Sequence, residues 1–310
     1  GMITETAALL VLALGLDALF GEPRMLWQRI PHPAVVMGRI IAWADRRYNT
    51  ENAAARSAGV TVMALLSLGA LGLGATIALL PYGEVISILI AAILIAQRSL
   101  ISHVLAVRDA LGLSLPEARR ALSDIVGRDT AELGESEISR AAIESAAENF
   151  SDGVIAPAFW FLILGLPGVL LYKLVNTADS MIGHRTPRHE EFGFAAAKFD
   201  DILNYIPARL SGALIAAVCG KPAAGAVMRE DASKHPSPNA GWPEAAMAGA
   251  LDITLAGPRS YHGHLSDHPS LNAAGRAEAT RSDISNAVTI LWKSWAAFVF
   301  AVLFLAVLAT

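Results

Sequence analysis

The chain has 310 residues, of which 54% are hydrophobic and only 17% are charged. Soluble domains average about 25% charged residues, so the composition excludes a typical cytosolic enzyme. A formal net charge of −4 argues against nucleic-acid binding through bulk positive charge, and the single cysteine, Cys219, excludes an internal disulfide.

Five or six apolar segments approach the length of about 20 residues that a helix needs to cross a bilayer. They cover residues 6–20, 58–80, 85–96, 154–175, 202–220 and 287–309. Segment 202–220 is marginal because it contains Pro207 and Arg209. Segment 154–175 is interrupted by Pro157 and by Leu166–Pro167–Gly168, which favours a re-entrant hairpin over a straight span. We therefore predict an all-α, polytopic membrane protein with about four to six membrane helices.

Polar connections at residues 21–57, 97–152, 176–201 and 221–286 separate these segments. The first is rich in arginine, which predicts a cytoplasmic location by the positive-inside rule. We expect all four connections on this one face of a multi-pass inner-membrane protein. Residues 1–310 are predicted to form a single membrane domain, in which 97–152 and 221–286 are the larger helical and loop connections.

The connection 97–152 has the pattern of two soluble helices. In "SLPEARRALSDIVG", Ser114 is the expected cap, Pro116 lies in the first turn and Gly127 is the expected end. In "GESEISRAAIESAAENFSDG", Ser136 is the expected cap and Gly153 is expected to follow the last turn. No alternating strand pattern persists anywhere in the chain.

Three acids lie at the end of this second helix, directly before an apolar run. Glu144, Glu148 and Asp152 are spaced four apart, so a helix would place them on one face. They offer the hard oxygen ligands that Mg²⁺ uses while it also holds phosphates. The alternative is a solvated acidic face, or one that caps the next helix. Further candidate metal ligands are Asp179, Asp200 and Asp201.

The segment "NTADSMIGHRTPRHEEFG" combines acids, hydroxyls, histidines and arginines. Arg185 and Arg188 carry guanidinium groups that suit phosphate or carboxylate, and His184 has an ordinary pKa that suits proton transfer. Asn176 and Ser180 lie at helical spacing from these groups. The alternative is a basic cytoplasmic loop that only fixes membrane orientation.

The segment "KHPSPNAGWPEA" holds three prolines and a glycine, which predicts a rigid, extended loop rather than a helix. Such a loop could hold side chains against a ligand, or it could be only a structural corner. The candidate side chains are Lys234, His235, Asn239, Trp242 and Glu244. The histidines of "YHGHLSDH" do not match a metal motif, and we expect a solvated loop there.

At these motifs the chain resembles the CobD/CbiB family, the adenosylcobinamide-phosphate synthases. The resemblance rests on "DALFGEP" with "HPAVVMGR", on "ESAAENFSDGVIAPAFW", on the run from "LPGVLLYKLVNTADS" to "FDDILNYIPARL", and on "KHPSPNAGWPEAAMAGAL" with "GPRSY". These motifs extend from near the start of the chain to about Tyr261. The segment that follows, "HGHLSDH", is where the chain departs from the family pattern.

The resemblance implies an enzyme that joins an aminopropanol, or its O-phosphate, to the propionate carboxylate of adenosylcobyric acid. ATP and Mg²⁺ would activate the carboxylate. It implies metal binding by the acids named above, catalysis by Glu148, His184, Lys198 and Arg185, and phosphate or substrate binding by residues that include Arg188, Lys234 and His32. Other enzymes of cobalamin synthesis or a second copy of the chain are further partners that it suggests.

Two other classes of function remain open on the sequence alone. The chain also resembles, more distantly, AmpE-type membrane proteins, which are read as sensors without catalysis. A corrinoid transporter would predict two related halves with broken helices in corresponding positions. Only one such broken segment, around Pro167, is found.

Overall fold

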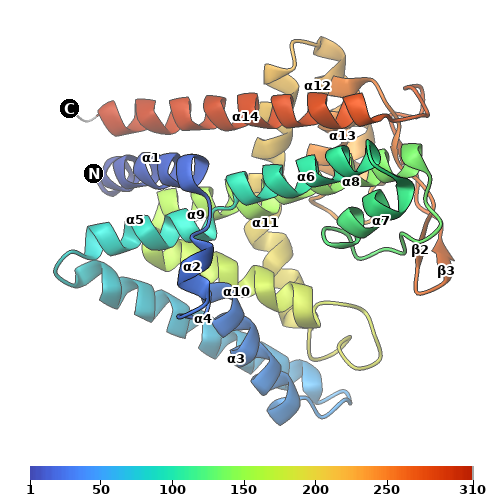
Figure 1. Ribbon diagram of the computed structural model, residues 1–310. Helices are drawn as coiled ribbons and strands as arrows, with labels where there is room; N and C mark the ends of the chain where they lie inside the picture. The colour runs from blue at the N-terminus through green and yellow to red at the C-terminus, as the bar shows by residue number, and fades with distance from the viewer. Residues whose placement is uncertain (309–310) are drawn as a thin grey trace. The chain divides into compact units, whose positions relative to one another are not determined.

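The computed structural model describes residues 1–308, which are predominantly helical (Figure 1). They divide into two compact units. Unit 1 comprises residues 1–96, 156–204 and the end of the chain from Val302, whereas unit 2 comprises residues 97–155 and 205–301. The long helices α11 (Phe194–Val218) and α14 (Arg281–Val307) contribute to both units.

Besides its parts of α11 and α14, unit 1 consists of seven helices. These are α1 (Met2–Phe20), α2 (Arg24–Trp27), α3 (Pro33–Tyr48), α4 (Ala55–Leu79), α5 (Gly83–Leu94), α9 (Ala156–Leu164) and α10 (Leu166–Ile182). Helix α10 packs against α3, α4, α5 and α9, and its apolar face forms the core with Tyr172 and Phe192 fully buried. Glycines permit this close packing, because a Cβ on Gly59 would collide with the Phe192 carbonyl and one on Gly74 with Pro167.

The interrupted apolar segment folds back on itself in unit 1. Gly165, with a φ of 72°, separates α9 from α10, and the two helices pack against each other. Gly168 lies so close to the backbone of Trp160 that a side chain there would collide with it. The predicted hairpin is therefore present, although its break falls at Gly165, one residue before the predicted site.

Unit 2 contains the larger polar connections. Its helices are α6 (Gln97–Leu111), α7 (Leu115–Ser123), α8 (Glu135–Phe150), a π-helical turn (Ser151–Ile155), α12 (Pro222–Asp231), a 3₁₀ turn (Ala232–Lys234) and α13 (Gly241–Leu251). Helix α8 packs against α6, α7 and α13, and α12 packs against α13. The predicted cap at Ser114 is confirmed, since its hydroxyl accepts from Glu117 N at 3.3 Å.

Three local predictions in unit 2 are wrong. Helix α8 begins after Gly134, so Ser136 lies inside its first turn and does not cap it. Gly153 does not follow a helix end, because the chain continues through the π-helical turn directly into α9. The proline-rich loop is confined to His235–Ala240, and helix α13 already begins at Gly241, because Pro243 fits a first helical turn where no backbone donor is needed.

Short strands occupy residues 255–271, where the sequence has no persistent strand pattern. They are β1 (Leu255–Ala256), β2 (Arg259–Tyr261), β3 (His264–Ser266) and β4 (Ser270–Leu271). Strand β2 pairs with β3 in an antiparallel hairpin, and β1 pairs with β4. His262 and Gly263 form the turn of the hairpin with positive φ, which explains why this segment is more ordered than the predicted solvated loop.

Four helical segments of the described chain are long and apolar enough to cross a membrane. They are Met2–Phe20, Ala55–Leu79, Gly83–Leu111 and Arg281–Val307. Segment 154–175 is not among them because its helices are too short. Most of 202–220 lies in α11, which is not among them either. The protein is thus an all-α, multi-pass membrane protein, at the lower end of the predicted number of spans.

Candidate active site

In unit 1, helices α10 and α11 bring two of the predicted acids together. Asp200 on α11 accepts hydrogen bonds at Oδ1 from Asn176 Nδ2 at 3.2 Å and from Asn204 Nδ2 at 3.1 Å. Its carboxyl group is also hydrogen-bonded to that of Asp179 on α10. We call Asp179 and Asp200 the acid pair.

Asp200, in the acid pair, binds a proton more tightly than an ordinary aspartate does. Burial, followed by the negative charge of Asp179, raises the pKa of Asp200 to about 8. Two carboxyl groups in contact cannot both ionise cheaply, so one of them keeps a proton that the other accepts. At neutral pH the pair therefore holds one proton in place of a compensating cation.

Neighbouring side chains fix the geometry of the acid pair. Asn204, one turn after Asp200, accepts a hydrogen bond at Oδ1 from the buried hydroxyl of Tyr172 at 2.9 Å. Its amide nitrogen thereby points at Asp200. Tyr172 and Asn204 were not predicted, although Asn204 stands four residues after Asp200 on the same helix, which is the spacing that would have indicated it.

The donor set of the acid pair suits Mg²⁺. Among residues 1–308, no three His, Cys, Asp or Glu side chains gather closely enough to form a complete metal site. Mg²⁺, however, is usually bound by one or two carboxylates together with substrate phosphates and water. A pair of proton-sharing carboxyls is such a set, since a divalent cation could take the place of the shared proton.

Positive groups lie beside the third acid of unit 1. Burial raises the pKa of Asp201, and the charges of Lys198 and Arg185 partly oppose this shift. Lys198 and Arg185 are both exposed. Lys198 and Arg185 therefore lie close enough to Asp201 to change the pKa of its carboxyl group, and their charged side chains are exposed to solvent.

Other predicted residues of unit 1 already have partners. The His184 Nε2 lies 2.9 Å from the Ser180 carbonyl, and the Ser180 hydroxyl donates to the Asn176 carbonyl at 3.1 Å. Arg188 forms ion pairs with Asp45, at 3.1 Å, and with Glu51. Through these ion pairs Arg188 connects its own loop to Asp45 on α3 and to Glu51 in the segment that follows α3.

In unit 2, both carboxylate oxygens of Glu144 have hydrogen-bond partners, and one of them faces two arginines. Its Oε1 accepts from Ala256 N at 2.6 Å and its Oε2 from Arg128 Nη2 at 2.9 Å, with Arg259 Nη2 at 3.5 Å from the same Oε2. The side chain is 2% exposed. Both oxygens of Glu144 therefore have protein partners, and the residue acts as a structural counter-ion for Arg128 and Arg259.

Glu148 and Glu244 lie near Glu144, and we call these three residues the carboxyl cluster. Burial raises the pKa of Glu148, against the positive charges of His235, Arg259 and Arg128, although water still reaches this side chain. Burial also raises the pKa of Glu244 to about 7, against its contact with His235. A carboxyl that titrates near neutrality, as Glu244 does, suits proton transfer.

His235 faces this cluster with a fixed ring orientation. Its Nδ1 accepts from Ser237 N at 3.0 Å, so the neutral ring carries its proton on Nε2, which lies 2.7 Å from Glu244 Oε2. Burial would lower the pKa of His235, but Glu244 and Glu148 outweigh it and raise the pKa. The same His-Pro turn recurs in unit 1, where His32 Nδ1 accepts from Ala34 N at 3.0 Å.

The three remaining predicted residues of unit 2 contact either Asp231 or Arg209. Lys234 is exposed and forms an ion pair with Asp231 at 2.8 Å. Asn239 accepts from Arg209 Nη1 at 3.1 Å, and Trp242 presents its ring to the same guanidinium at 4.9 Å. Arg209, which was not predicted, is thus the residue that Asn239 and Trp242 position.

Asp152 lies beyond helix α8, in the π-helical turn. The surroundings of Glu144 and Glu148 come from distant segments, which bring in Arg128, Arg259, His235 and Glu244. Arg128 and Arg259 were missed, because the sequence spacing of neither residue relates it to Glu144.

Comparisons with known proteins identify the family to which the chain belongs. The model of the family described as CobD/Cbib protein matches residues 10–291. The chain belongs to the CobD/CbiB family. This confirms the resemblance found in the sequence, and it covers both units. No solved structure matches the chain.

Curated relatives of the CobD/CbiB family match along nearly the whole chain. A Brucella anthropi protein is 48% identical over 303 residues, covering 92% of both chains. A Rhizobium meliloti protein is 46% identical over 318 residues, covering 97% of both, and a Rhodobacter capsulatus protein is 47% identical over 278, covering 86% of this chain and 87% of its own. Each of these relatives is named cobalamin biosynthesis protein CobD.

Proposed function

We propose that the protein is an ATP- and Mg²⁺-dependent amide ligase of cobalamin synthesis. It would join (R)-1-amino-2-propanol, or its O-phosphate, to the propionate carboxylate of adenosylcobyric acid, giving adenosylcobinamide or its phosphate. The observation that carries the proposal is the match to cobalamin biosynthesis proteins over almost the entire chain. The two acidic sites supply the groups that this chemistry needs.

Unit 1 has the residues suited to activation of the carboxylate. The chemistry supplied by ATP with Mg²⁺ is conversion of the carboxylate to an acyl phosphate or acyl adenylate. The acid pair, with Asp201 as a further ligand, would hold the metal. Lys198 and Arg185 would neutralise charge that develops on the phosphoryl group, since both lie near Asp201 and are exposed.

Unit 2 has the residues suited to handling the amine. The amine must lose a proton as its nitrogen forms the new C–N bond and the activating phosphate leaves. Glu148 is the proposed base, because its raised pKa makes the carboxylate a stronger proton acceptor than an ordinary glutamate and its side chain is exposed to water. His235 and Glu244 would receive that proton and keep the site electrostatically balanced.

The Arg-rich connection 21–57 places the active face in the cytoplasm in this proposal, where ATP is available. The proposal leaves Glu144 out of the metal set, because its oxygens have partners in Arg128 and Ala256. It likewise leaves Arg188 out of phosphate binding, since Arg188 pairs with Asp45 and Glu51.

The test is product formation by detergent-purified protein with adenosylcobyric acid, the amino alcohol or its phosphate, ATP and Mg²⁺. We expect Asp200→Asn and Glu148→Gln to lower the rate at least about a hundredfold, as removal of a metal ligand or a general base does. The matched controls are Glu190→Gln in unit 1 and Glu135→Gln in unit 2, both at exposed acids. Folded wild-type protein that makes no product with either amino alcohol would refute the ligase.

A further inference from the structure

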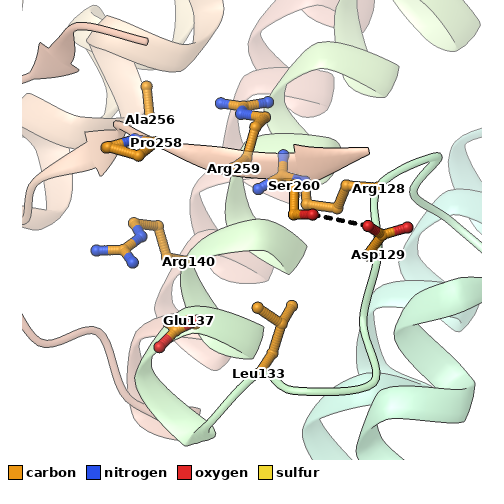
Figure 2. Close-up of a pocket in the computed structure, with 9 residues that line it drawn as sticks. All are labelled: Arg128, Asp129, Leu133, Glu137, Arg140, Ala256, Pro258, Arg259 and Ser260. Carbon is orange, nitrogen blue, oxygen red and sulfur yellow. Dashed lines mark hydrogen bonds between the residues drawn. The ribbon is translucent and has the colours of Figure 1, made fainter. Parts of the chain in front are cut away.

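A recess in unit 2 is lined by three arginines from three separate segments. It has a cavity volume of about 30 Å³ and lies between the loop after α7, the first turns of α8 and the start of β2 (Figure 2). Arg128 comes from the loop, Arg140 from α8 and Arg259 from β2. We call this site the arginine recess.

The arginines have more donors than the protein satisfies. Arg128 and Arg259 are 14% and 12% exposed and share the single carboxylate of Glu144. The Nε of Arg259 is buried without a hydrogen-bond partner among residues 1–308. Arg140 is half-buried and, within the same described residues, has neither an ion pair nor a hydrogen bond.

The acids that line the recess do not supply the missing partners. Asp129 is used by the β2–β3 hairpin, where it accepts from Ser260 Oγ at 2.7 Å, from Gly263 N at 2.8 Å and from His262 N at 3.0 Å. Figure 2 shows the hydrogen bond between Ser260 and Asp129 as a dashed line. Glu137 is exposed and makes no ion pair with Arg140 in the described chain, although the two are one turn apart on α8.

A purely structural role explains only part of this arrangement. An Arg–Glu–Arg contact around Glu144 accounts for the position of Arg128 and of one end of Arg259. It does not account for Arg140, nor for the unpartnered Nε of Arg259. A half-buried arginine without a counter-ion, as Arg140 is among the described residues, is costly unless an anion reaches it, and planar guanidinium groups suit the oxygens of a phosphate.

We propose that the arginine recess binds the phosphate group of a phosphorylated substrate. This deepens the proposed function and rests on it for the source of the phosphate, which would be either the O-phosphate of the amino alcohol or the phosphates of the nucleotide. Of the two, the amino-alcohol phosphate fits better, because the recess is small and belongs to the same unit as Glu148, the proposed base for the amine.

The test is binding to the full-length protein in detergent by isothermal titration calorimetry. The probes are (R)-1-amino-2-propanol O-phosphate, the free amino alcohol, and ATP. Arg140→Gln should weaken binding of the amino-alcohol phosphate by about tenfold or more and leave the free amino alcohol unchanged, because a hydrogen bond between charged groups contributes about 1.5–3 kcal/mol. Arg140→Lys should restore part of the loss. Arg120→Gln is the matched control, since Arg120 is exposed and paired with Glu117 at 3.0 Å.

Each outcome has one meaning. Weaker binding of ATP instead of the amino-alcohol phosphate would keep the phosphate site and assign it to the nucleotide. Unchanged affinity of folded Arg140→Gln for both phosphate compounds, or no binding of either by the wild type, would overturn the proposal. Wild-type protein that binds the phosphate through Arg140 but forms no amide product would leave the recess standing while the ligase falls.

Discussion

The acid pair of unit 1 and the carboxyl cluster of unit 2 both bring carboxyl groups close together, but the charges around the two sites differ. Asp200 lies against another acid and receives only neutral amide donors, from Asn176 and Asn204. Glu144 and Glu244, in contrast, each face a cationic or ionisable base, from Arg128 and from His235. The first arrangement lacks positive charge and suits a cation, whereas the second is compensated within the protein and suits proton transfer.

The largest expected effect concerns the compensated side. Glu144→Gln should lower the free energy of unfolding by about 3–5 kcal/mol, because it leaves Arg128 and Arg259 buried without their shared counter-ion. Chemical unfolding in detergent, followed by tryptophan fluorescence, measures the change. Glu135→Gln, at an exposed acid on the same helix, should change it by no more than about 0.5 kcal/mol. Equal losses in the two variants would show that Glu144 is not a structural counter-ion.

The opposite sign is expected for the acid pair. In the unfolded chain Asp200 ionises near its ordinary pKa of 3.8, whereas in the folded protein its pKa is about 8. Between these values the folded state holds a proton that the unfolded state has released, so stability falls as the pH rises. Asp200→Asn removes this penalty and should stabilise the protein at pH 8 by about 2 kcal/mol, while product formation is lost.

Unfolding of wild type and Asp200→Asn at pH 5 and pH 8 tests that sign. The gain should be smaller at pH 5, because the folded wild type is then fully protonated at Asp200 and the unfolded chain is closer to its own pKa. Glu190→Gln is the control, since Glu190 is an exposed acid of the same unit. An Asp200→Asn variant less stable than the wild type at pH 8 would mean that the acid pair is a structural contact and not a strained site.

Sequence reasoning predicted the helical class and most of the apolar segments, and it singled out several residues that the fold brings together, for a shared reason. Long apolar runs and polar motifs are local signals, and Asn176, Asp179 and Asp200 stand out within such motifs. Sequence reasoning failed where the local backbone conformation determines where a helix begins or ends. Helix α8 begins before the cap predicted at Ser136, and Pro243 lies in the first turn of a helix where proline suggested an extended loop.

The partners of the acids could not be predicted from spacing. Arg128 and Arg259 are 16 and 115 residues from Glu144, so only the folded chain relates them to it. The same holds for Arg188, which suited a phosphate in the sequence until the fold placed Asp45 and Glu51 beside it. Residue type indicated which side chains carry charge, whereas tertiary contacts decided which of those charges are already used.

The smallest expected effect is a pH slope from His235 and Glu244. Glu244 ionises near 4.5 when unfolded and near 7 when folded, so its contribution to stability falls as the pH rises through this window. The pKa of His235 is also raised, so its contribution is complete below about 6.5 and is lost as the pH rises through its folded value. Both shifts have the same sign, and the wild type should lose about 1–2 kcal/mol between pH 5 and pH 8 through this contact.

Glu244→Gln should flatten that slope, as measured by unfolding at intervals of one pH unit. Asp129→Asn is the matched control, because hydrogen bonds from Gly263 and Ser260 outweigh desolvation and lower the pKa of Asp129. Its contribution is present above about 3.8 and is lost only as the pH falls through its folded value, so this variant should keep the wild-type slope. A slope that persists in Glu244→Gln would mean that Glu148 titrates in place of Glu244, because Glu148 lies in the same cluster and its pKa is raised as well. The proposed base and its proton acceptor would then exchange roles, while the compensated character of the cluster would stand.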